Sequence, residues 1–406
     1  MKTIVTGCTR NIGITIIRAL ASSGHEVIGI DDRPMPLGLR SRYAAKYESY
    51  KAENEEEEYE GIERLVRKHR PSALVTGRLT PLLARHAHQL SSYTNLLLPD
   101  PGSYERLTDK LWLCRSCQSL GIPAPRALSE QQAKDLLSEG RVGATEPTVV
   151  IKPREDFGGG QGVKMISNAE DIAPALEEVG REFGSSFISE FVPGPPEDIV
   201  ALNLMFDQES RLLDFFAFEK LRLWPPKTGV TALGRSIFVN DLVERLLPIF
   251  EILKWRGAAD AEFKIDETTG EAKLLEINGR FTGALAFSTA CGVNFPKLVC
   301  DAAIGKSVPS DLVPRYLEGI LYWNPKLFAK SVWTDWRRSG YRWQTVSDAL
   351  SQATGRKVST LWQFDDPAPI LGKALITCKD VMTKHRSPNQ PRTRYSRFGP
   401  KGSSSS

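Results

Sequence analysis

Two apolar runs joined by a turn constrain the fold of this chain more than any other feature. Residues 258–265 and 272–278 both have the composition of β-strands, and the segment between them reads Asp-Glu-Thr-Thr-Gly-Glu, which favours a turn. We therefore predict a β-hairpin in which Glu262 lies opposite Glu276. The other cross-strand pairs in this register are Asp260 with Asn278, Lys264 with Leu274, Ala261 with Ile277, Phe263 with Leu275 and Ile265 with Lys273.

One face of the expected hairpin gathers the oxygen-bearing side chains of Asp260, Glu262, Glu276 and Asn278. Carboxylates placed directly across a β-ladder repel each other unless a cation lies between them. Hard oxygen ligands suit magnesium, which usually takes one or two carboxylates and completes its shell with water and phosphate oxygens. This face therefore predicts a magnesium site, and a merely solvated acidic face is the alternative.

A second group of residues has the character of a phosphate-binding site. The apolar run 147–153 predicts a strand that carries Lys152, and the glycine-rich segment 157–163 follows it closely. Consecutive glycines leave backbone N–H groups accessible to phosphates, and a lysine on a neighbouring strand adds a positive charge. The alternative for the glycines alone is a flexible hairpin tip, but a buried lysine needs a partner.

Two further segments fit the same kind of site. Residues 188–194 form an apolar strand that ends at a Pro-Gly turn, and Glu197 follows, so this edge can offer backbone groups to a base and a carboxylate to ribose. Taken alone, it also fits an ordinary strand end. Arg280 directly follows the expected metal ligands, where a guanidinium can hold a phosphoryl group.

The N-terminus has the pattern of a βαβ unit. Residues 2–6 predict a buried strand, 7–13 a glycine-containing turn, 14–23 a helix and 26–31 a second strand. The turn lacks the middle glycine that allows a dinucleotide to approach the backbone. We therefore expect a Rossmann-like domain whose glycines serve the turn and its packing, and a dinucleotide site is the alternative.

Together these residues resemble the ATP-grasp superfamily over roughly residues 1–305, and the run 275–280 resembles its metal-binding strand. The resemblance implies an α/β and α+β fold, in which a Rossmann-like domain precedes two subdomains that clamp ATP between antiparallel sheets. It also assigns roles to individual positions. Lys110 and Lys152 would contact phosphates, Gly158, Gly159, Gly160 and Gly162 would form the closing loop, Glu190, Phe191 and Val192 the adenine hinge, and Glu197 the ribose ligand.

The same resemblance makes Glu262, Glu276 and Asn278 the metal ligands, with Mg²⁺ or Mn²⁺ as the ion, and places Arg280 beside the transferred phosphate. Lys220 and Arg235 match looser positions for cations that hold phosphate or substrate. One departure is Gly279, where a proline is common in the family.

We expect the domains 1–98 (Rossmann-like), 99–305 (ATP-grasp, with subdomains at about 110–184 and 185–305) and 306–383 (no assigned chemistry), followed by a disordered basic tail at 384–406. An amphipathic helix is expected at 104–120, ending at Gly121. Cys114 and Cys117 lie within it, and with no second cysteine pair they predict helix packing rather than a zinc site.

The resemblance implies that a substrate carboxylate is activated by ATP as an acyl phosphate and coupled to an amine, so the expected partners are these two small molecules. A carboxylase or phosphotransferase is the nearest alternative, followed by an NAD-dependent oxidoreductase and a nucleotide-binding regulator without catalysis. The sequence does not indicate an oligomeric state, and a homodimer is possible.

Composition narrows the class of protein. The chain has 406 residues, 41% hydrophobic and 25% charged, and a net charge of +4 without a basic stripe, which argues against nucleic acid as the main partner. No run of about 18 apolar residues is present, and the N-terminus enters a strand without a charged leader. Six scattered cysteines fit reduced thiols, and we expect a cytoplasmic protein with no membrane contact.

Overall fold

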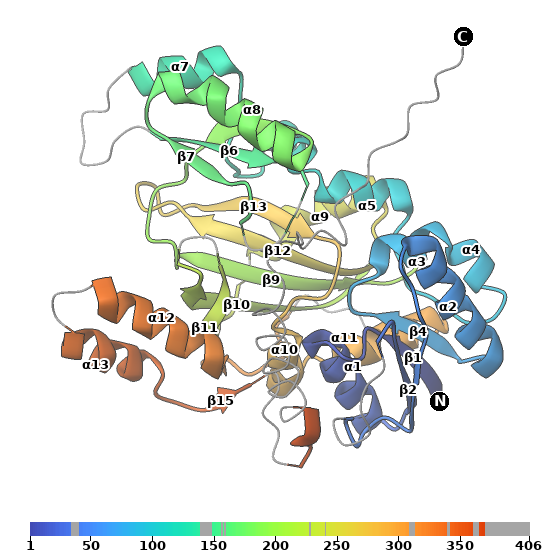
Figure 1. Cartoon of the computed structure of the whole chain (residues 1–406). Helices are drawn as coiled ribbons and strands as arrows, with labels where there is room; N and C mark the ends of the chain where they lie inside the picture. The colour runs from blue at the N-terminus through green and yellow to red at the C-terminus, as the bar shows by residue number, and fades with distance from the viewer. Residues whose placement is uncertain are drawn as a thin grey trace, which may run out of the picture.

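Three β-sheets form the framework of the protein in the computed structural model (Figure 1). The structure describes residues 1–33, 40–138, 148–155, 157, 160–226, 229–239, 241–307, 313–338, 342–359 and 365–369. The expected loop residues Gly158 and Gly159 and the expected tail at 384–406 lie outside the described residues.

The N-terminal unit is a four-stranded parallel sheet, as its βαβ pattern predicts, with strand order β3-β2-β1-β4. Its elements are β1 (Lys2–Thr6), α1 (Asn11–Ser22), β2 (Glu26–Asp31), β3 (Lys46–Ser49), α2 (Glu55–His69) and β4 (Ala73–Thr76), followed by α3 (Thr80–Arg85) and α4 (Ala87–Leu90). A Cβ on Gly13 would lie 2.2 Å from the carbonyl oxygen of Gly7, so Gly13 lets α1 start directly against the turn.

A small antiparallel sheet with strand order β5-β8-β6-β7 forms the second layer, at the top of Figure 1. It comprises β5 (Ala127–Leu128), β6 (Val149–Pro153), β7 (Lys164–Ile166) and β8 (Ser186–Glu190). The helices α7 (Glu130–Ser138) and α8 (Ile172–Phe183), with the 3-10 turn η2 (Ala169–Asp171), cover one face with a separate apolar core. The other face of the small sheet is not covered by these helices and faces the large sheet.

The large sheet has seven strands in the order β13-β12-β9-β10-β11-β14-β15. Its strands are β9 (Ile199–Phe206), β10 (Leu212–Trp224), β11 (Val230–Ser236), β12 (Gly257–Ile265), β13 (Ala272–Asn278), β14 (Leu321–Trp323) and β15 (Lys357–Val358). The associated helices are α9 (Asp241–Leu253), α10 (Leu285–Cys291), α11 (Phe295–Ala303), α12 (Pro325–Arg338) and α13 (Arg342–Gln352). The expected boundary at residue 305 precedes β14, which is hydrogen-bonded to β11, so the described part of 306–359 extends this sheet.

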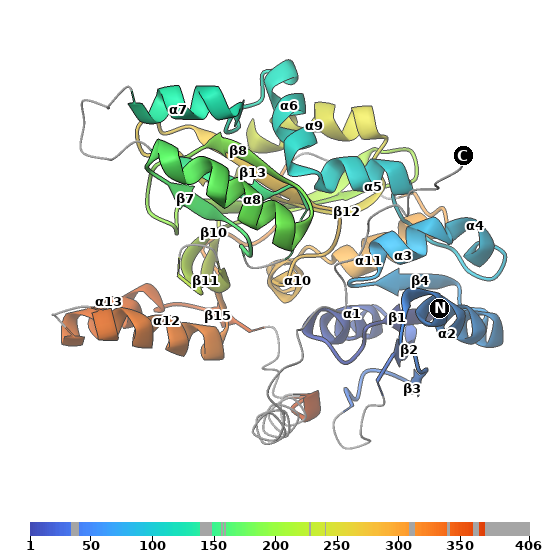
Figure 2. The same cartoon turned by 45° about the horizontal axis from the view of Figure 1, so that its top comes forward.

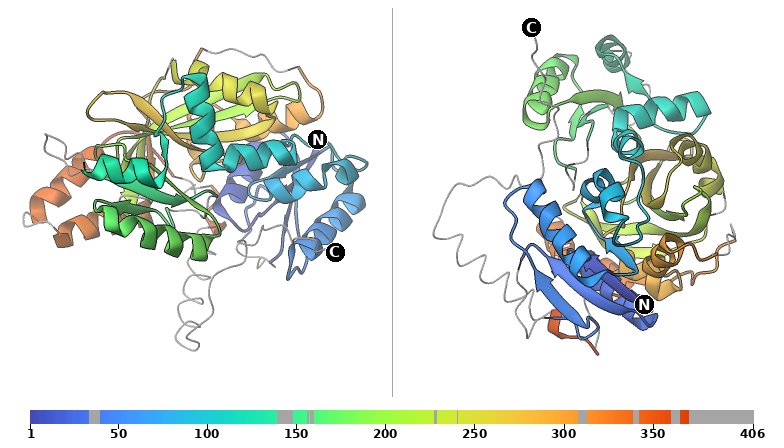
Figure 3. Two further views of the ribbon diagram at one scale, coloured as in Figure 1. Left: turned by 90° about the horizontal axis from the view of Figure 1, so that it is seen from above. Right: turned by 90° about the vertical axis from the view of Figure 1, so that its right-hand side faces the viewer.

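One apolar core joins the N-terminal unit to the large sheet. Helix α1 packs against α10 and α11, which follow β13 in the chain, and the core cluster runs from Val5 and Ile17 to Phe216 and Phe287. Figure 2 shows α10 and α11 between the N-terminal unit (blue) and the large sheet, and both views in Figure 3 show the N-terminal unit beside the rest of the molecule. The first and last thirds of the chain are thus held in one body.

The structure corrects two details expected from the sequence. The helix expected at 104–120 is two helices, α5 (Pro101–Thr108) and α6 (Lys110–Leu120), because Asp109 has extended backbone angles and its side chain caps α6. In the hairpin, the expected pairs Asp260–Asn278, Ala261–Ile277 and Glu262–Glu276 form. A register shift after Glu262 then places Phe263 opposite Leu274 and Lys264 opposite Lys273. The shift turns Leu274, not Leu275, into the core, where it is 1% exposed.

Among the described residues, no helix is both long and apolar enough to cross a bilayer. Cys114 and Cys117 are buried on α6, and burial raises the pKa of the Cys117 thiol to about 12. Both thiols therefore act as small apolar groups in the helix packing.

Candidate active site

A cavity of about 680 Å³ lies between the small sheet and the large sheet. Its walls come from β6 and β8 on one side and from β10, β12 and β13 on the other. The cavity also receives Asn11 from the start of α1, and Tyr322, Asn324 and Leu327 from β14 and α12. The N-terminal unit, the small sheet and the large sheet with its C-terminal extension therefore all contribute residues to this cavity.

Glu262 and Glu276 face each other across β12 and β13 at the cavity wall. Each carboxylate has a lysine partner from a different element. Lys220 Nζ on β10 lies 2.7 Å from Glu262 Oε1, and Lys110 Nζ at the start of α6 lies 3.2 Å from Glu276 Oε2. Burial opposes ionisation of Glu276, but Lys110 and Lys220 outweigh it and hold the pKa of that carboxyl below its usual range.

Asp260 and Asn278 form the next pair along the hairpin, and both are buried. Asn203 Nδ2 on β9 donates to Asp260 Oδ1 at 2.6 Å. Burial and the nearby Glu262 carboxylate raise the pKa of Asp260 to about 7. Asn278 Nδ2 donates to Glu276 Oε1 at 3.3 Å, so the amide is already oriented by the carboxylate beside it.

Two more cations line the cavity. Lys152, at the end of β6, is 8% exposed, and its Nζ lies 5.2 Å from the centre of the Phe187 ring; burial lowers its pKa. Arg280 follows β13, and its guanidinium donates to Asn278 Oδ1 at 3.4 Å and to the Phe281 carbonyl at 3.3 Å. The acidic pair is therefore surrounded by four basic side chains, Lys110, Lys152, Lys220 and Arg280.

The end of the cavity near the small sheet is apolar. It is lined by Val150, Met165, Phe191, Val192 and Leu275. Ser189 also lines it, and its buried Oγ has no hydrogen-bond partner among the described residues. The carboxylate of Glu190 is turned toward Arg126, whose Nε donates to Oε1 at 2.6 Å. This end suits a flat heterocycle that also carries a polar edge.

Comparison with known proteins agrees with this geometry. Residues 239–321 match the family model described as "ATP-grasp in the biosynthetic pathway with Ter operon". A D-aspartate ligase from Enterococcus faecium (strain Aus0004) is 23% identical over 238 residues, covering 54% of this chain and 55% of the ligase. The chain thus spans about half the length of the curated relative it matches.

Solved structures match over more of the chain. The biotin carboxylase domain of Hydrogenobacter thermophilus 2-oxoglutarate carboxylase, in complex with MgADP, superposes with a TM-score of 0.60 and 17% identity, covering 78% of this chain and 72% of that one. An L-amino acid ligase from Bacillus licheniformis gives a TM-score of 0.52 and 16% identity over 74% of each chain. This chain has the ATP-grasp fold.

ATP and magnesium are general features of ATP-grasp proteins, and the side chains present fit a magnesium nucleotide. The described residues contain no group of three or more His, Cys, Asp or Glu side chains arranged around a metal position. Two carboxylates and one amide oxygen are nevertheless the set that magnesium uses when phosphates and water complete its shell. The apolar slot fits the base, and the four cations fit the phosphates.

The ATP-grasp cavity collects most of the site residues expected from the sequence. Those that line it are Lys110, Lys152, Gly160, Glu190, Phe191, Val192, Lys220, Glu262, Glu276, Asn278 and Arg280. Their individual roles remain predictions. Gly162, Glu197 and Arg235 are not among the lining residues. Arg235 follows Gly234, which pairs with Lys220 in the sheet, so its side chain points to the opposite face and pairs with Glu219 there.

Several cavity residues were not singled out from the sequence. Thr282 and Gly283 lie two and three residues after Arg280, and Asn11 lies in the expected glycine-containing turn, so these three had a local signal. Tyr322, Asn324 and Leu327 had none, because they reach the cavity only through the pairing of β14 with β11.

Proposed function

We propose that this ATP-grasp protein is a ligase that uses ATP to couple a carboxylate to an amine. The observation that carries the proposal is the facing pair Glu262 and Glu276, each held by a lysine, at the wall of a cavity large enough for a nucleotide and small substrates. The D-aspartate ligase and the L-amino acid ligase among its relatives support a reaction of this class.

In the proposed reaction a carboxylate oxygen of the substrate attacks the γ-phosphorus of ATP, ADP leaves, and an acyl phosphate forms. The amine nitrogen then attacks the acyl carbon, phosphate leaves, and the amine loses a proton. The first step brings an anion against a triphosphate, so its cost is mainly electrostatic. Magnesium bound by Glu262, Glu276 and Asn278 would supply charge neutralisation at the phosphates.

The basic side chains of the cavity would bind the phosphates and the transferred phosphoryl group. Lys110 and Lys152 reach the cavity from the start of α6 and from β6 and would bind the phosphates. Arg280, beside the metal-binding amide, would hold the phosphoryl group as it moves and the acyl phosphate that results. Burial of this site limits water, which would otherwise hydrolyse the intermediate.

The alternative function is a carboxylase, which the biotin carboxylase neighbour favours. A carboxylase and a ligase share the nucleotide half of the cavity, so the reactants separate them. Phosphate release that depends on an amine and not on bicarbonate supports the ligase, and the reverse supports the carboxylase.

The test is a screen of amino acids and small acids, in pairs with amines, for release of ADP and phosphate. In the active pair, Glu276→Gln should abolish substrate-dependent ADP release, because the amide keeps the size of the side chain but removes a metal-binding charge. ADP release at the wild-type rate in this variant would refute the assignment. Glu271→Gln, an exposed change at the hairpin turn, is the matched control and should behave as the wild type.

A further inference from the structure

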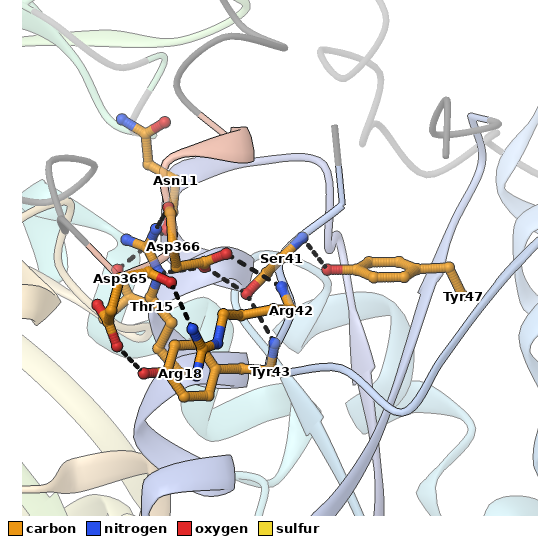
Figure 4. A network of polar contacts seen from close by, with 9 residues as sticks. All are labelled: Asn11, Thr15, Arg18, Ser41, Arg42, Tyr43, Tyr47, Asp365 and Asp366. Carbon is orange, nitrogen blue, oxygen red and sulfur yellow. Dashed lines mark hydrogen bonds and ion pairs between the residues drawn. The ribbon is translucent and has the colours of Figure 1, made fainter. Parts of the chain in front are cut away.

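The C-terminal segment 365–369 docks on the N-terminal unit through a buried carboxylate (Figure 4). Asp366 is 1% exposed. Its Oδ2 accepts from Arg18 Nε at 2.9 Å and from Ser41 Oγ at 2.5 Å, and its Oδ1 accepts from the Arg42 backbone N–H at 3.0 Å. Arg18 also donates to the Asp366 carbonyl at 2.8 Å. A carboxylate this well satisfied holds its segment in one position.

Arg18 lies on the same helix as a cavity residue. Asn11, Thr15 and Arg18 are spaced i, i+4 and i+7 along α1, so they share one face of the helix. Thr15 Oγ1 donates to the Asn11 carbonyl at 3.1 Å, which ties the first turn to the second. Asp366 thus fixes one end of a helical face whose other end reaches the ATP-grasp cavity.

Asn11 presents an unused acceptor to that cavity. Its Oδ1 is buried and has no hydrogen-bond partner among the described residues, and its side chain points away from the Asp366 cluster in Figure 4. An amide oxygen repels phosphate and carboxylate oxygens and pairs with an N–H donor. Asn11 comes from the N-terminal unit, away from the apolar slot for the base, so among the proposed reactants the amine is the donor that suits it.

We propose that Asn11 Oδ1 accepts a hydrogen bond from the amine substrate and that Asp366, acting through Arg18, is a positioning residue for that contact. The inference rests on the proposed ligase function and adds the place where the amine binds. It also gives a role to residues 365–369, which lie outside the cavity lining and are joined by hydrogen bonds to Arg18 on α1.

The experiment is a double-mutant cycle in the full-length chain, with KM for the amine, KM for ATP and kcat measured for each variant. Asn11→Ala should raise KM for the amine by about tenfold, because a hydrogen bond to a charged or polar donor is lost. Asp366→Asn should raise the same KM by up to about tenfold, because it removes the negative charge to which Arg18 Nε donates. The double variant should match Asn11→Ala alone, because Asp366 acts through Asn11.

Asp365→Asn is the matched control. Asp365 is the neighbouring carboxylate, it is exposed, and it accepts from Tyr43 Oη, so this variant should keep the wild-type KM for both substrates. Amide hydrogen exchange in α1 gives a readout that does not depend on turnover, and it should be faster in Asp366→Asn than in the wild type or in Asp365→Asn.

An unchanged KM for the amine in Asp366→Asn, or an effect that adds in full to that of Asn11→Ala, would overturn the inference while the ligase function stands. If the wild type releases no phosphate in response to any amine, the proposed function fails instead. In that case amide hydrogen exchange in α1 alone decides whether Asp366 positions the helix. If α1 exchanges at the same rate in Asp366→Asn as in the wild type, the positioning role of Asp366 is refuted.

Discussion

Arg280 is the residue where the chemistry of the site can be tested most directly. It comes two residues after Asn278, and its guanidinium donates to the oxygen of that amide, so it lies next to the expected metal and next to the cavity. A cation in this position opposes charge that builds up on a phosphoryl group during transfer.

We expect Arg280→Ala to lower kcat by about 10²- to 10³-fold, because removing a group that stabilises the transition state acts on turnover. The dissociation constant for ATP should change far less, since Lys110 and Lys152 remain. Steady-state kinetics together with nucleotide titration separates the two effects. Arg245→Ala, an exposed arginine on α9, is the control, and equal losses in both arginine variants would contradict the role of Arg280.

At this scale, the sequence predicted the pairing of Glu262 with Glu276 because strand alternation and the turn length leave little freedom. It did not predict which lysine would contact which carboxylate. Lys110 and Lys220 come from a helix and a strand that meet the hairpin only in three dimensions. The sequence also did not predict on which face of the sheet the side chain of Arg235 lies. Arg235 was matched to the family at a single position, and a shift of one residue along a strand moves a side chain to the opposite face.

Among the elements, the break between α5 and α6 matters most for the site. Asp109 Oδ1 accepts from the backbone N–H groups of Leu111 and Trp112, and Arg154 at the end of β6 donates to the same carboxylate. The backbone N–H of Lys110 donates to the Arg154 carbonyl at 2.9 Å. The cap therefore places Lys110 where it can reach Glu276.

We expect Asp109→Ala to lower the free energy of unfolding by about 1 kcal/mol at neutral pH through loss of the cap. Burial opposes ionisation of Asp109, but Arg154 and the capped N–H groups lower its pKa below the ordinary 3.8. The stabilisation is therefore complete above that value and is lost as the pH falls through the lower pKa of the folded state. Denaturant unfolding at pH 7 and at pH 3 should show the difference between variant and wild type shrinking, and a constant difference would contradict this account.

The strands β6, β8, β12 and β13, which carry the expected metal ligands, Lys152 and Glu190, were predictable because their apolar runs are short and bounded by turns. Strand β11 of the large sheet was not expected from the sequence. The helix break at Asp109 was not, because residues on both sides keep a helical spacing and only the extended angles of Asp109 separate them. The register shift in the hairpin was equally hidden. Residues 274 and 275 are both leucines, so the sequence alone does not show which of the two side chains enters the core.

For the molecule as a whole, the seven-stranded sheet does not end at residue 305. Strand β14 covers the edge of β11, and Phe328 on α12 packs with Leu233 of that strand. The sequence assigned no chemistry to this region, because its short apolar pieces carry neither a clear period nor a motif. The fold class itself was confirmed, since the ATP-grasp resemblance of the segments 147–163, 188–197 and 258–280 implied this fold.

A chain that ends at residue 306 should therefore aggregate, because it exposes the hydrogen-bonding edge of β11 and the apolar residues beneath α12. Size-exclusion chromatography of the purified protein gives the measurement. A chain that ends at residue 369 keeps β14, α12, α13, β15 and the contacts of Asp366, and it serves as the control, which should remain monodisperse. Equal behaviour of the two truncated chains would contradict the structural role of β14.

The pairing of early and late segments also sets an order for synthesis on the ribosome. Strands β1 to β4 are complete by residue 76, yet α1 packs on α10 and α11, which emerge more than 200 residues later. The hydrogen bonds of Arg18 on α1 to Asp366 form later still, after Asp366 has been translated. A nascent chain must therefore carry one uncovered face of α1 through most of its translation, and a chaperone has this apolar surface to protect during that interval.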